Sequence, residues 1–370
     1  MTIKHADEYR DPEISRKLVE QITNLSKKKI RLMEVCGTHT MSIFRNGIRN
    51  VIPETISLIS GPGCPVCVTA QSEIDAFIEL AGEPDTIITT FGDLMRVPGT
   101  GSSLQKERAE GRDIRMVYST FDALEIAVKN PEKRVVFLGV GFETTAPTVA
   151  ASILAAREMK AGNFFVYSAH KTVPQALFAL VKTEGIRIDG FILPGHVSVI
   201  IGTGAYLPFF NQCRVPCVVA GFEPSDILQA LLMLVRQIEN KAPGLENAYP
   251  RAVSFEGNKK AVGVMNQVFE PADVAWRGIG IIPRSGLKIR DEFSGYDAGK
   301  RFSITEKVSQ EPKGCACGEI LTGLKTPVEC ALYKKICTPV DPVGPCMVSS
   351  EGTCAAYYKY HDTGPGILKV

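Results

Sequence analysis

The sequence predicts an α/β protein with two similar parallel-sheet, Rossmann-like domains and an irregular C-terminal domain. Short and almost continuously apolar segments alternate with amphipathic segments up to about residue 240, which is typical of parallel α/β layers. Beyond about residue 241 this alternation ends, glycine and proline become frequent, and six of the 11 cysteines follow. At 370 residues the chain is long enough for two or three cores. We therefore expect α/β domains over 28–130 and 131–240 and a third domain over 241–370, with 1–27 as a candidate addition to it.

The individual elements follow from caps and apolar runs. Asp11 is a good N-cap and Pro12 suits a first helical position, so a helix should run from there to about Lys27. Strands are expected at 30–35, 56–59, 86–90, 114–118, 135–140, 164–167, 191–193 and 216–220. Helices are expected between them at 72–81, 121–129, 147–160, 174–183 and 225–239. In the last of these, Leu231, Leu234 and Ile238 share one face, as in a helix that packs on a sheet.

Charge and hydropathy exclude several classes of protein. The 42 basic and 40 acidic residues nearly cancel, so we expect no binding of nucleic acid or of an anionic membrane. Residues 1–11 are mostly polar and contain no apolar run, so we expect no secretory signal and a cytoplasmic location. Residues 191–213 lack formal charges, but Pro194, Gly202 and Pro208 interrupt them. We expect buried strand and loop there, with no membrane-spanning helix.

Two short sequence motifs occur twice along the chain in similar form. Cys67-Val68-Thr69-Ala70 resembles Cys217-Val218-Val219-Ala220, and His39-Thr40-Met41-Ser42-Ile43 resembles His196-Val197-Ser198-Val199-Ile200. The two His-to-Cys spacings, 28 and 21 residues, differ. Either the α/β halves are similar folds, or short apolar words match by chance.

Six cysteines crowd the C-terminal region. This density exceeds what core packing supplies in a reducing compartment, and clustered thiolates bind zinc or iron-sulfur centres. Zinc sites usually show paired C-x2–4-C knuckles, which are missing here, so a cluster is favoured over zinc and over unliganded thiols. Spacing alone leaves the four ligands open, and of the close pair Cys315 and Cys317 one can ligate while the other acts as a redox thiol. The six are Cys315, Cys317, Cys330, Cys337, Cys346 and Cys354.

A C-x-x-C pair lies in Gly61-Pro62-Gly63-Cys64-Pro65-Val66-Cys67. Such a turn brings two sulfurs together, as in dithiol oxidoreductases and metal clips. A rigid loop with incidental thiols is the alternative. A thioredoxin would start its active-site helix at this motif, whereas Thr69 and Ser72 predict a helix start several residues later.

Cys36 and His39 follow the first expected strand, in Glu34-Val35-Cys36-Gly37-Thr38-His39-Thr40. Ligands bind beyond the carboxyl ends of strands in open α/β sheets, and this loop offers a soft and a borderline metal ligand. A buried, unreactive cysteine is the alternative.

Two further loops supply candidate cleft residues. Gly139-Val140-Gly141-Phe142-Glu143-Thr144-Thr145 lacks the third glycine of a dinucleotide fingerprint but can present Glu143 at a cleft, unless it is only a capped turn. Pro194-Gly195-His196-Val197-Ser198 places His196 after a strand, where a structural histidine is the alternative. No P-loop motif occurs, so no nucleotide site is assigned.

Together these words resemble the HypD family of hydrogenase maturation factors. The resemblance covers essentially the whole chain. It rests on the three motifs that contain Cys36, Cys64 and His196, on Gly141-Phe142-Glu143-Thr144-Thr145-Ala146-Pro147-Thr148, and on the cysteine-rich tail. Each word alone is moderately specific, whereas the set is highly specific.

The resemblance implies a scaffold for the iron of nickel-iron hydrogenases, which carries two cyanide ligands and one carbon monoxide, Fe(CN)2CO. It implies a small chaperone partner of the HypC type that shares the iron, and cyanide delivery by maturation proteins of the HypE and HypF types. Carried over by motif, Cys36 is the candidate iron ligand, and Cys64 and Cys67 are thiols beside it that ligate iron or pass electrons.

The resemblance also implies a four-iron four-sulfur (4Fe-4S) cluster. The family spacing C-x14-C-x6-C-x16-C is satisfied by Cys315, Cys330, Cys337 and Cys354. Cys317 and Cys346 then remain as a dithiol beside the cluster, similar to ferredoxin:thioredoxin reductase. The corresponding hypothesis is an electron relay through these thiols to the iron site.

Two functions of other classes stay open at this point. A thiol-disulfide oxidoreductase would use the C-x-x-C and a cluster but would not need Cys36. A zinc-stabilised interaction protein would be colourless and redox-inert. Cys213 and Cys217 are expected to be core thiols.

Overall fold

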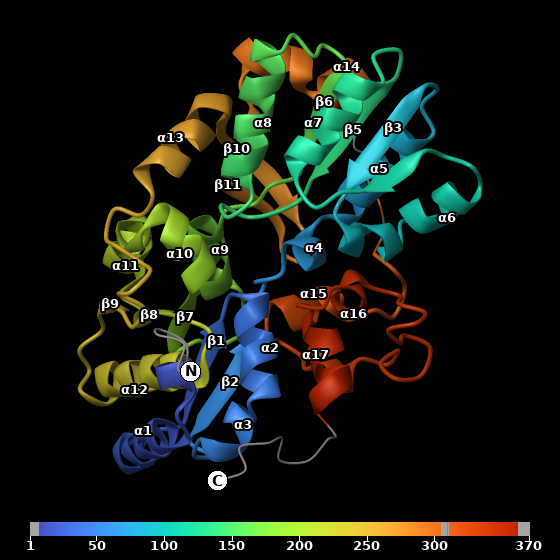
Figure 1. Ribbon diagram of the computed structural model, residues 1–370. Coiled ribbons are helices and arrows are strands. Elements are labelled where there is room, and N and C mark those ends of the chain that lie inside the picture. Colours follow the sequence, from blue (N-terminus) through green and yellow to red (C-terminus); the bar gives the residue numbers. More distant parts are fainter. Residues whose placement is uncertain (1–6, 305–308, 310, 362–370) are drawn as a thin grey trace.

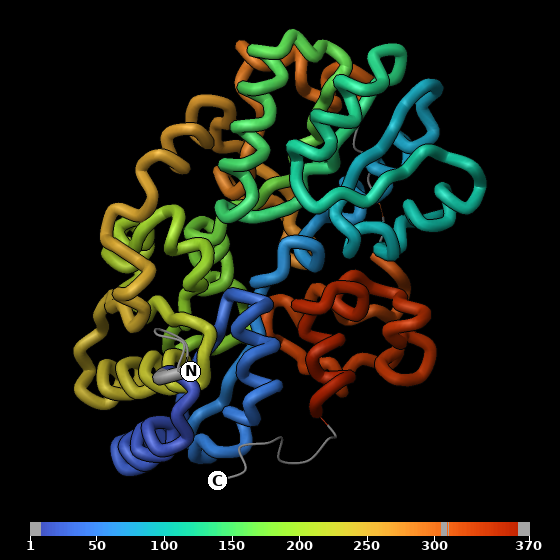
Figure 2. Tube along the Cα trace, in the orientation of Figure 1, coloured from blue at the N-terminus to red at the C-terminus, as the bar shows by residue number. Residues whose placement is uncertain are grey.

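The computed structural model describes residues 7–304, 309 and 311–361, and its chain forms two parallel β-sheets, an antiparallel hairpin and a small helical C-terminal region (Figures 1 and 2). Residues 1–6 of the expected signal-free N-terminus lie outside the described residues. The predicted α/β fold class with parallel sheets is confirmed.

The first sheet has five parallel strands in the order β2-β1-β7-β8-β9. The strands are β1 (Ile30–Glu34), β2 (Ile56–Ser60), β7 (Gly190–Pro194), β8 (Cys217–Ala220) and β9 (Leu245–Asn247). Its helices include α1 (Pro12–Leu25), α2 (Gly37–Arg45), α3 (Ile48–Val51), α10 (Gly195–Ile201), α11 (Leu207–Cys213) and α12 (Pro224–Glu239). Leu18 and Ile22 of α1 share a buried cluster with Leu231 of α12, so the N-terminal helix packs on this sheet unit.

The second sheet has four parallel strands in the order β4-β3-β5-β6. The strands are β3 (Thr86–Thr90), β4 (Ile114–Met116), β5 (Arg134–Gly139) and β6 (Phe164–Ser168). The helices of this part of the chain are α5 (Gln71–Ala81), α6 (Leu104–Ala109), α7 (Thr120–Lys129), α8 (Ala146–Glu158) and α9 (Val173–Lys182). Strands β3, β5 and β6 are largely buried, as expected for strands covered on both faces, whereas the edge strand β4 is only partly buried.

The sheets do not follow the expected boundary at residue 130. After β2 the chain leaves the first sheet, builds the whole second sheet, and returns to the first sheet at β7. The two units are therefore interleaved in sequence, because β7 pairs with β1 and not with the preceding β6.

The segment after residue 241 also differs from the expected third domain. It contributes β9 to the first sheet and then α13 (Lys259–Val268), β10 (Phe269–Trp276), β11 (Gly280–Ile289) and α14 (Ala298–Arg301). Met265, Phe269 and Leu287 share a buried cluster with the second sheet, so this stretch covers that unit. Figure 1 shows α13, β10 and β11 beside α8.

The cysteine-rich tail is a separate small unit of short helices. These are α15 (Cys317–Leu321), a 3-10 turn (Pro327–Glu329), α16 (Pro345–Val348) and α17 (Thr353–Tyr360). Figure 1 places this unit, in red, beside α2 and α4 (Pro65–Val68). We call residues 311–361 the tail unit.

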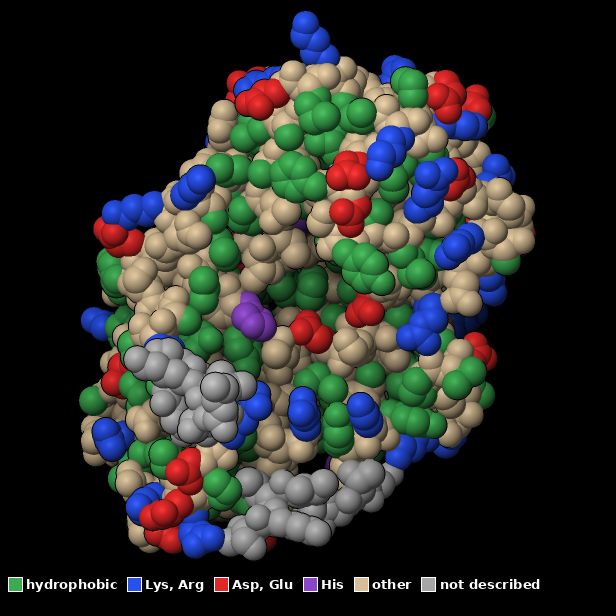
Figure 3. All heavy atoms as spheres, in the orientation of Figure 1, with side chains coloured by type: hydrophobic (Ala, Val, Ile, Leu, Met, Phe, Trp, Pro, Cys, Tyr) green, Lys and Arg blue, Asp and Glu red, His purple; other side chains and the backbone are tan. Residues whose placement is uncertain are grey.

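The uncharged stretch 191–213 is more helical than expected. After β7 it forms α10, a 3-10 turn and α11. Pro194 is the N-cap of α10, and Pro208 lies in the first turn of α11, where proline suits the start of a helix. Gly202, at φ +75°, separates the helices. Within the described residues, no helix has the length and apolar character needed to cross a bilayer. Figure 3 shows basic and acidic side chains interspersed over the face in view.

Candidate functional site

Cys36 lies where β1 ends and α2 begins. It is the N-cap of α2, with an extended backbone (φ −152°), and its side chain is buried. Its amide N–H donates to Oε2 of Glu34 (3.3 Å), and the Thr40 hydroxyl donates to Oε1 of the same carboxyl group (2.5 Å). The fully buried Glu34 carboxyl group therefore fixes the turn at Cys36 through these two hydrogen bonds.

The loop after β2 lies directly against this turn. The Gly37 amide donates to the Gly63 carbonyl (3.0 Å), and the Gly61 amide donates to the Glu34 carbonyl (2.8 Å). A Cβ atom at Gly63 would lie 2.0 Å from the backbone nitrogen of Cys36, so only glycine fits. Because β1 and β2 are paired neighbours, their carboxyl ends bring Cys36 and the C-x-x-C loop together.

The C-x-x-C motif starts a helix, which corrects the expectation of a later start. The one-turn helix α4 (Pro65–Val68) begins directly after Cys64 and ends before α5. Pro65 starts this extra turn of helix, because proline suits a first helical position. The turn is too short to have been expected, and the helix that residues 69–72 predict follows it as α5. The Cys64 Sγ accepts the Cys67 amide N–H at 3.3 Å, and the two Sγ atoms are 2.6 Å apart.

All six tail cysteines line one small cavity of about 10 Å³, although three of them come from irregular segments. The other walls are the side chains of Ile320, Leu332, Tyr333 and Met347 and the backbone of Gly344. A Cβ atom at Gly344 would lie 2.8 Å from the Cys315 Sγ, so glycine makes room for that thiol. The Sγ atoms of Cys317 and Cys346 are 2.8 Å apart.

Cys346 connects the tail thiols to the C-x-x-C thiols. Its thiol interacts with those of Cys317, Cys354 and Cys67. The Cys67 thiol also reaches the carbonyl of Pro345 in α16, at 3.9 Å. The thiols of Cys64, Cys67, Cys346 and Cys317 therefore form a continuous row of neighbouring sulfur atoms, which we call the thiol file.

Two further contacts fix the tail unit against this file. The Thr38 hydroxyl donates to Glu351 (2.5 Å), and a Cβ atom at Gly37 would lie 2.5 Å from the Glu351 side chain. On the other side, Gly278 packs so closely on Gly318 that a Cβ atom on it would lie 2.0 Å from the Gly318 Cα. Helix α2 and the β10–β11 turn therefore hold the tail unit from two directions.

Burial keeps the Cys36 and Cys67 thiols protonated. It raises the pKa of Cys36 to about 12 and that of Cys67 well above its usual value. Hydrogen bonding with Cys317 lowers the pKa of Cys346, but hydrogen bonds with Cys354 and Cys67, together with burial, raise it well above normal. Thiolate formation at this site therefore needs a positive charge or an opening of the structure.

His39 and His196 both pack against the ring of Phe222. The His196 ring stacks on Phe222 at a centroid distance of 3.9 Å, and the buried His39 ring lies 4.8 Å from it. His39 Nε2 bonds the Gly221 carbonyl (2.9 Å), while burial lowers the pKa of His39 to about 4 and also lowers that of His196. The recurring histidine words thus follow β1 and β7, two paired strands of one sheet. His196 is solvent-exposed and His39 is not.

Glu143 is buried and caps a helix. Its two carboxyl oxygens accept the Val173 amide N–H at the start of α9, at 3.0 and 3.3 Å. Burial raises the pKa of Glu143 to about 8. Cys217 is buried at the start of β8, and Cys213 is half-buried at the end of α11.

The donor set of the tail unit fits an iron-sulfur cluster better than a single ion. Within the described ranges, no three His, Cys, Asp or Glu side chains stand close enough to hold one metal ion. Six thiols around one apolar cavity match the number and kind of ligands of a 4Fe-4S cluster, with two to spare. The cavity is smaller than such a cluster, so the four ligating thiols have to move outward to hold one.

Three residues of the site were missed by sequence analysis. Glu34 was quoted only as the start of the Cys36 word, although a carboxylate ending a buried strand is itself a signal for a functional site. Glu351 and Gly278 gave no signal, because their importance lies in contacts between distant segments.

Comparison with known proteins gives one consistent result. The model of the family HypD, described as "Hydrogenase formation hypA family", matches residues 13–361. Similar proteins include the hydrogenase maturation factor HypD2 of Bradyrhizobium diazoefficiens, 47% identical over 368 residues that cover 97% of both chains. The hydrogenase maturation factors HypD of Rhizobium leguminosarum bv. viciae and of Cupriavidus necator are 46% and 43% identical over 368 residues each. They cover 97% of this chain and 96% and 97% of their own lengths.

Proposed function

This chain belongs to the HypD family of hydrogenase maturation factors, and we propose that it is the scaffold on which Fe(CN)2CO is assembled for nickel-iron hydrogenases. In this proposal Cys36 binds the iron, which is the cargo of the reaction. The observation that carries it is the file of thiols that begins beside Cys36 at Cys64 and Cys67 and continues into the tail unit.

The surroundings of Cys36 suit a transient iron ligand. The turn is held by Glu34 and Gly63, so the thiol position is defined before any metal arrives. With a pKa of about 12 the free thiol is neutral at pH 7, and a nearby ferrous ion would favour the thiolate and release the proton. Binding of iron would thus be linked to the loss of one proton at this sulfur, and release of iron to its uptake.

The two dithiols can exchange a disulfide without any further reactant. When Cys64 and Cys67 form a disulfide, the Cys346 thiol gives up its proton as its sulfur attacks the Cys67 sulfur, the S–S bond breaks, and the proton passes to the departing Cys64 sulfur. Cys317 then attacks Cys346 and releases Cys67. The products are a Cys317–Cys346 disulfide and a reduced Cys64–Cys67 pair, so two electrons have moved toward the iron site. The 2.8 Å separation of Cys317 and Cys346 supports the second step.

The tail unit would hold the electron source. Cys315, Cys330, Cys337 and Cys354 would ligate a 4Fe-4S cluster, which leaves Cys317 and Cys346 as the exchanging pair. Such a cluster supplies electrons one at a time when bound. The chain itself contributes the apolar walls that exclude water from these sulfurs.

The proposal includes partners and a compartment. Cys36 offers one thiol, so an iron ion needs ligands from elsewhere, which we assign to a small HypC-type chaperone. Proteins of the HypE and HypF types would deliver cyanide. The 11 unpaired thiols suit the cytoplasm, where thiols stay reduced.

Complementation separates this scaffold from the alternatives. In cells that lack their own HypD-type factor, we expect Cys36→Ala to abolish hydrogenase activity and Cys213→Ala to retain it. Anaerobically purified protein should be brown, with about four iron atoms and four sulfides per chain. Colourless protein that contains zinc would contradict the cluster, and an active Cys36→Ala variant would contradict the iron site.

The two dithiols also favour a second candidate, a general thiol-disulfide oxidoreductase. Such an enzyme would reduce protein disulfides equally well with Cys36→Ala, because Cys36 takes no part in the exchange. Retained hydrogenase maturation by Cys36→Ala together with disulfide reductase activity would therefore favour this function.

A further inference from the structure

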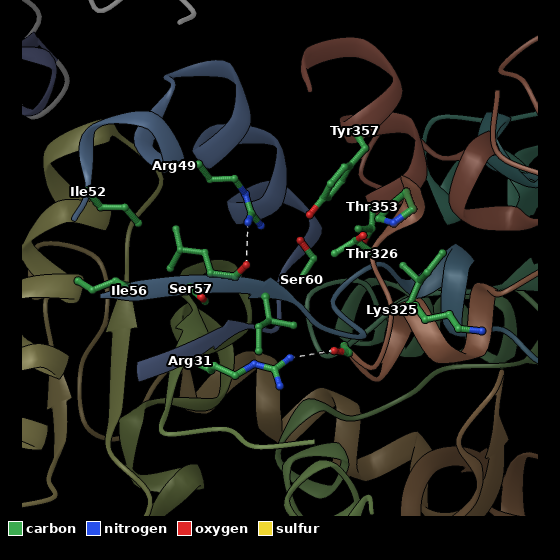
Figure 4. Close-up of a pocket in the computed structure, with 15 residues that line it drawn as sticks. Arg31, Arg49, Ile52, Ile56, Ser57, Ser60, Lys325, Thr326, Thr353 and Tyr357 are labelled. Atoms are coloured by element: carbon green, nitrogen blue, oxygen red, sulfur yellow. Dashed lines mark hydrogen bonds between the residues drawn. The ribbon is translucent and has the colours of Figure 1, made fainter. Parts of the chain in front are cut away.

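A second cavity, of about 460 Å³, lies between the edge strand β2 and the tail unit. None of the cysteines lines it, so it is distinct from the thiol file. Figure 4 shows Arg49, Ser60, Thr353 and Tyr357 converging on this space, with Arg31 on the other side of β2. Its size is within the range of small-molecule sites.

The lining of this cavity has an excess of positive charge. Three cationic side chains, Arg31, Arg49 and Lys325, line it, and no aspartate or glutamate does. Lys325 pairs with Glu319 (2.8 Å). Arg49 interacts electrostatically with the buried Glu34, but burial raises the pKa of that carboxyl group to about 7, so its negative charge is only partly developed at neutral pH. Four hydroxyl groups supply additional hydrogen-bond donors, from Ser57, Ser60, Thr353 and Tyr357, whereas the Thr326 hydroxyl already donates to Glu329 (2.8 Å).

Arg49 has a free hydrogen-bonding edge. Its Nη1 donates to the Leu58 carbonyl of β2 (2.7 Å). Its Nε and Nη2 are shielded from water and have no hydrogen-bond partner among the described residues. Buried guanidinium N–H groups without a partner are costly, since they have lost water and gained nothing in exchange.

The free atoms form the edge that arginine uses for oxyanions. Elsewhere in this chain, Arg10 binds Glu223 through Nε and Nη2 at 2.6 and 2.8 Å, and Arg115 binds Asp113 through the same two atoms. Two parallel N–H groups match two oxygens on one carbon or phosphorus atom. Arg49 therefore presents the same fork without its anion.

Aromatic rings hold this fork in place. The Arg49 guanidinium lies 4.7 Å from the centre of the Phe44 ring and 5.7 Å from that of Tyr357. Because the rings restrict the side chain, little conformational entropy is lost when an anion binds. Tyr357 also lines the cavity. Because Nε and Nη2 of Arg49 are shielded from water, neighbouring side chains have to shift as an anion reaches them.

We propose that this cavity is a binding site for a small oxyanion, a phosphate or carboxylate group, held by the Nε/Nη2 edge of Arg49, with the charge of Arg31 adding to the positive potential from the other side of β2. The site is separate from the proposed iron site and does not depend on it. Phosphate and acetate each present a pair of oxygens to the arginine but differ in charge and shape. Comparing the two therefore shows whether the site prefers a phosphate group or a carboxylate group.

Isothermal titration calorimetry on the anaerobically purified full chain tests the site, with inorganic phosphate and acetate as separate probes at constant ionic strength set by chloride. We expect saturable binding of at least one probe. Arg49→Gln and Arg31→Gln should each weaken it by roughly tenfold or more, and Arg49→Lys should also weaken it because lysine lacks the fork. Arg16→Gln, which removes one charge from the exposed face of α1, is the matched control and should bind as the unaltered chain does.

Two results would overturn the proposal. One is the absence of saturable heat with both phosphate and acetate. The other is unchanged affinity in the arginine variants. If Arg49→Gln does not fold, Arg31→Gln and Arg49→Lys decide the question.

Discussion

The Sγ atoms of Cys317 and Cys346 face each other at 2.8 Å inside the tail unit. Cys317 begins α15 and Cys346 lies in α16, so the pair joins two short helices across the cysteine-lined cavity. Cys346 also contacts Cys67, which makes this pair the link between the tail unit and the C-x-x-C loop.

The first prediction concerns this link. Cys346→Ser and Cys317→Ser should leave the visible absorption of the iron-sulfur cluster intact, since neither is a proposed ligand. They should lower hydrogenase maturation by about tenfold or more, because exchange with Cys67 then stops at a mixed disulfide or does not start. Absorption spectra and hydrogenase activity in complemented cells give the two readouts. Cys213→Ser, at the end of α11, is the control and should change neither the absorption spectrum nor the hydrogenase activity. Full hydrogenase maturation by Cys346→Ser would contradict the electron relay.

The second prediction concerns the contact between Gly63 and Cys36. A methyl group at Gly63 meets the Cys36 backbone at 2.0 Å, and backbone cannot move aside as a flexible side chain can. We expect Gly63→Ala to lower the free energy of unfolding by about 2 kcal/mol and to separate the C-x-x-C loop from Cys36. Gly101→Ala is the control, because nothing lies within 4 Å of its added methyl group. Denaturant unfolding of both variants tests this, and equal stabilities would contradict the close packing.

The third prediction concerns the pH dependence of stability. Burial raises the pKa of Glu143 from 4.5 to about 8, so the folded chain holds a proton that the unfolded chain has lost between these values. This group therefore makes folding less favourable as pH rises from about 4.5 to about 8, by up to about 1.4 kcal/mol per pH unit. Glu143→Gln removes the titration and keeps an acceptor for the Val173 amide.

Unfolding in urea at a series of pH values measures this effect. The variant should lose less stability than the unaltered chain between pH 5 and pH 8. Glu125→Gln on α7, whose carboxylate is 70% exposed, is the control and should follow the unaltered chain. Parallel stability curves for Glu143→Gln and the unaltered chain would show that Glu143 is ionised in the folded state.

Local sequence signals predicted the strands well. The runs at Thr86–Thr90 and Phe164–Ser168 are apolar, β-branched or aromatic, and a covered parallel strand needs little else. The order of strands could not be predicted in this way. The pairing of β7 with β1 depends on a long excursion through the second sheet, and no local pattern encodes that return.

Prolines explain two of the missed helices, α4 and α11. Pro65 and Pro208 were taken as signs of turns, but both occupy first-turn positions of short helices, where the missing N–H costs nothing. Single helices of four to seven residues carry too few positions for an apolar stripe to show.

The residues of the candidate site were visible, but their arrangement was not. Cys36, Cys64 and Cys67 stand at the ends of expected strands, so their proximity follows from parallel neighbours. The contact of Cys346 with Cys67 requires the tail unit to dock on α2 through Glu351. The docking of one unit on another depends on the shape of both surfaces, and no hydrophobic periodicity in the sequence indicates it.

The central claim is that Cys36 holds the iron that carries cyanide and carbon monoxide. Infrared spectroscopy tests it most directly, on the chain purified anaerobically with its small chaperone partner. The account predicts cyanide and carbonyl stretching bands in the unaltered complex. It also predicts their loss in Cys36→Ala, while the visible absorption of the cluster persists. Bands of full intensity in Cys36→Ala would contradict it.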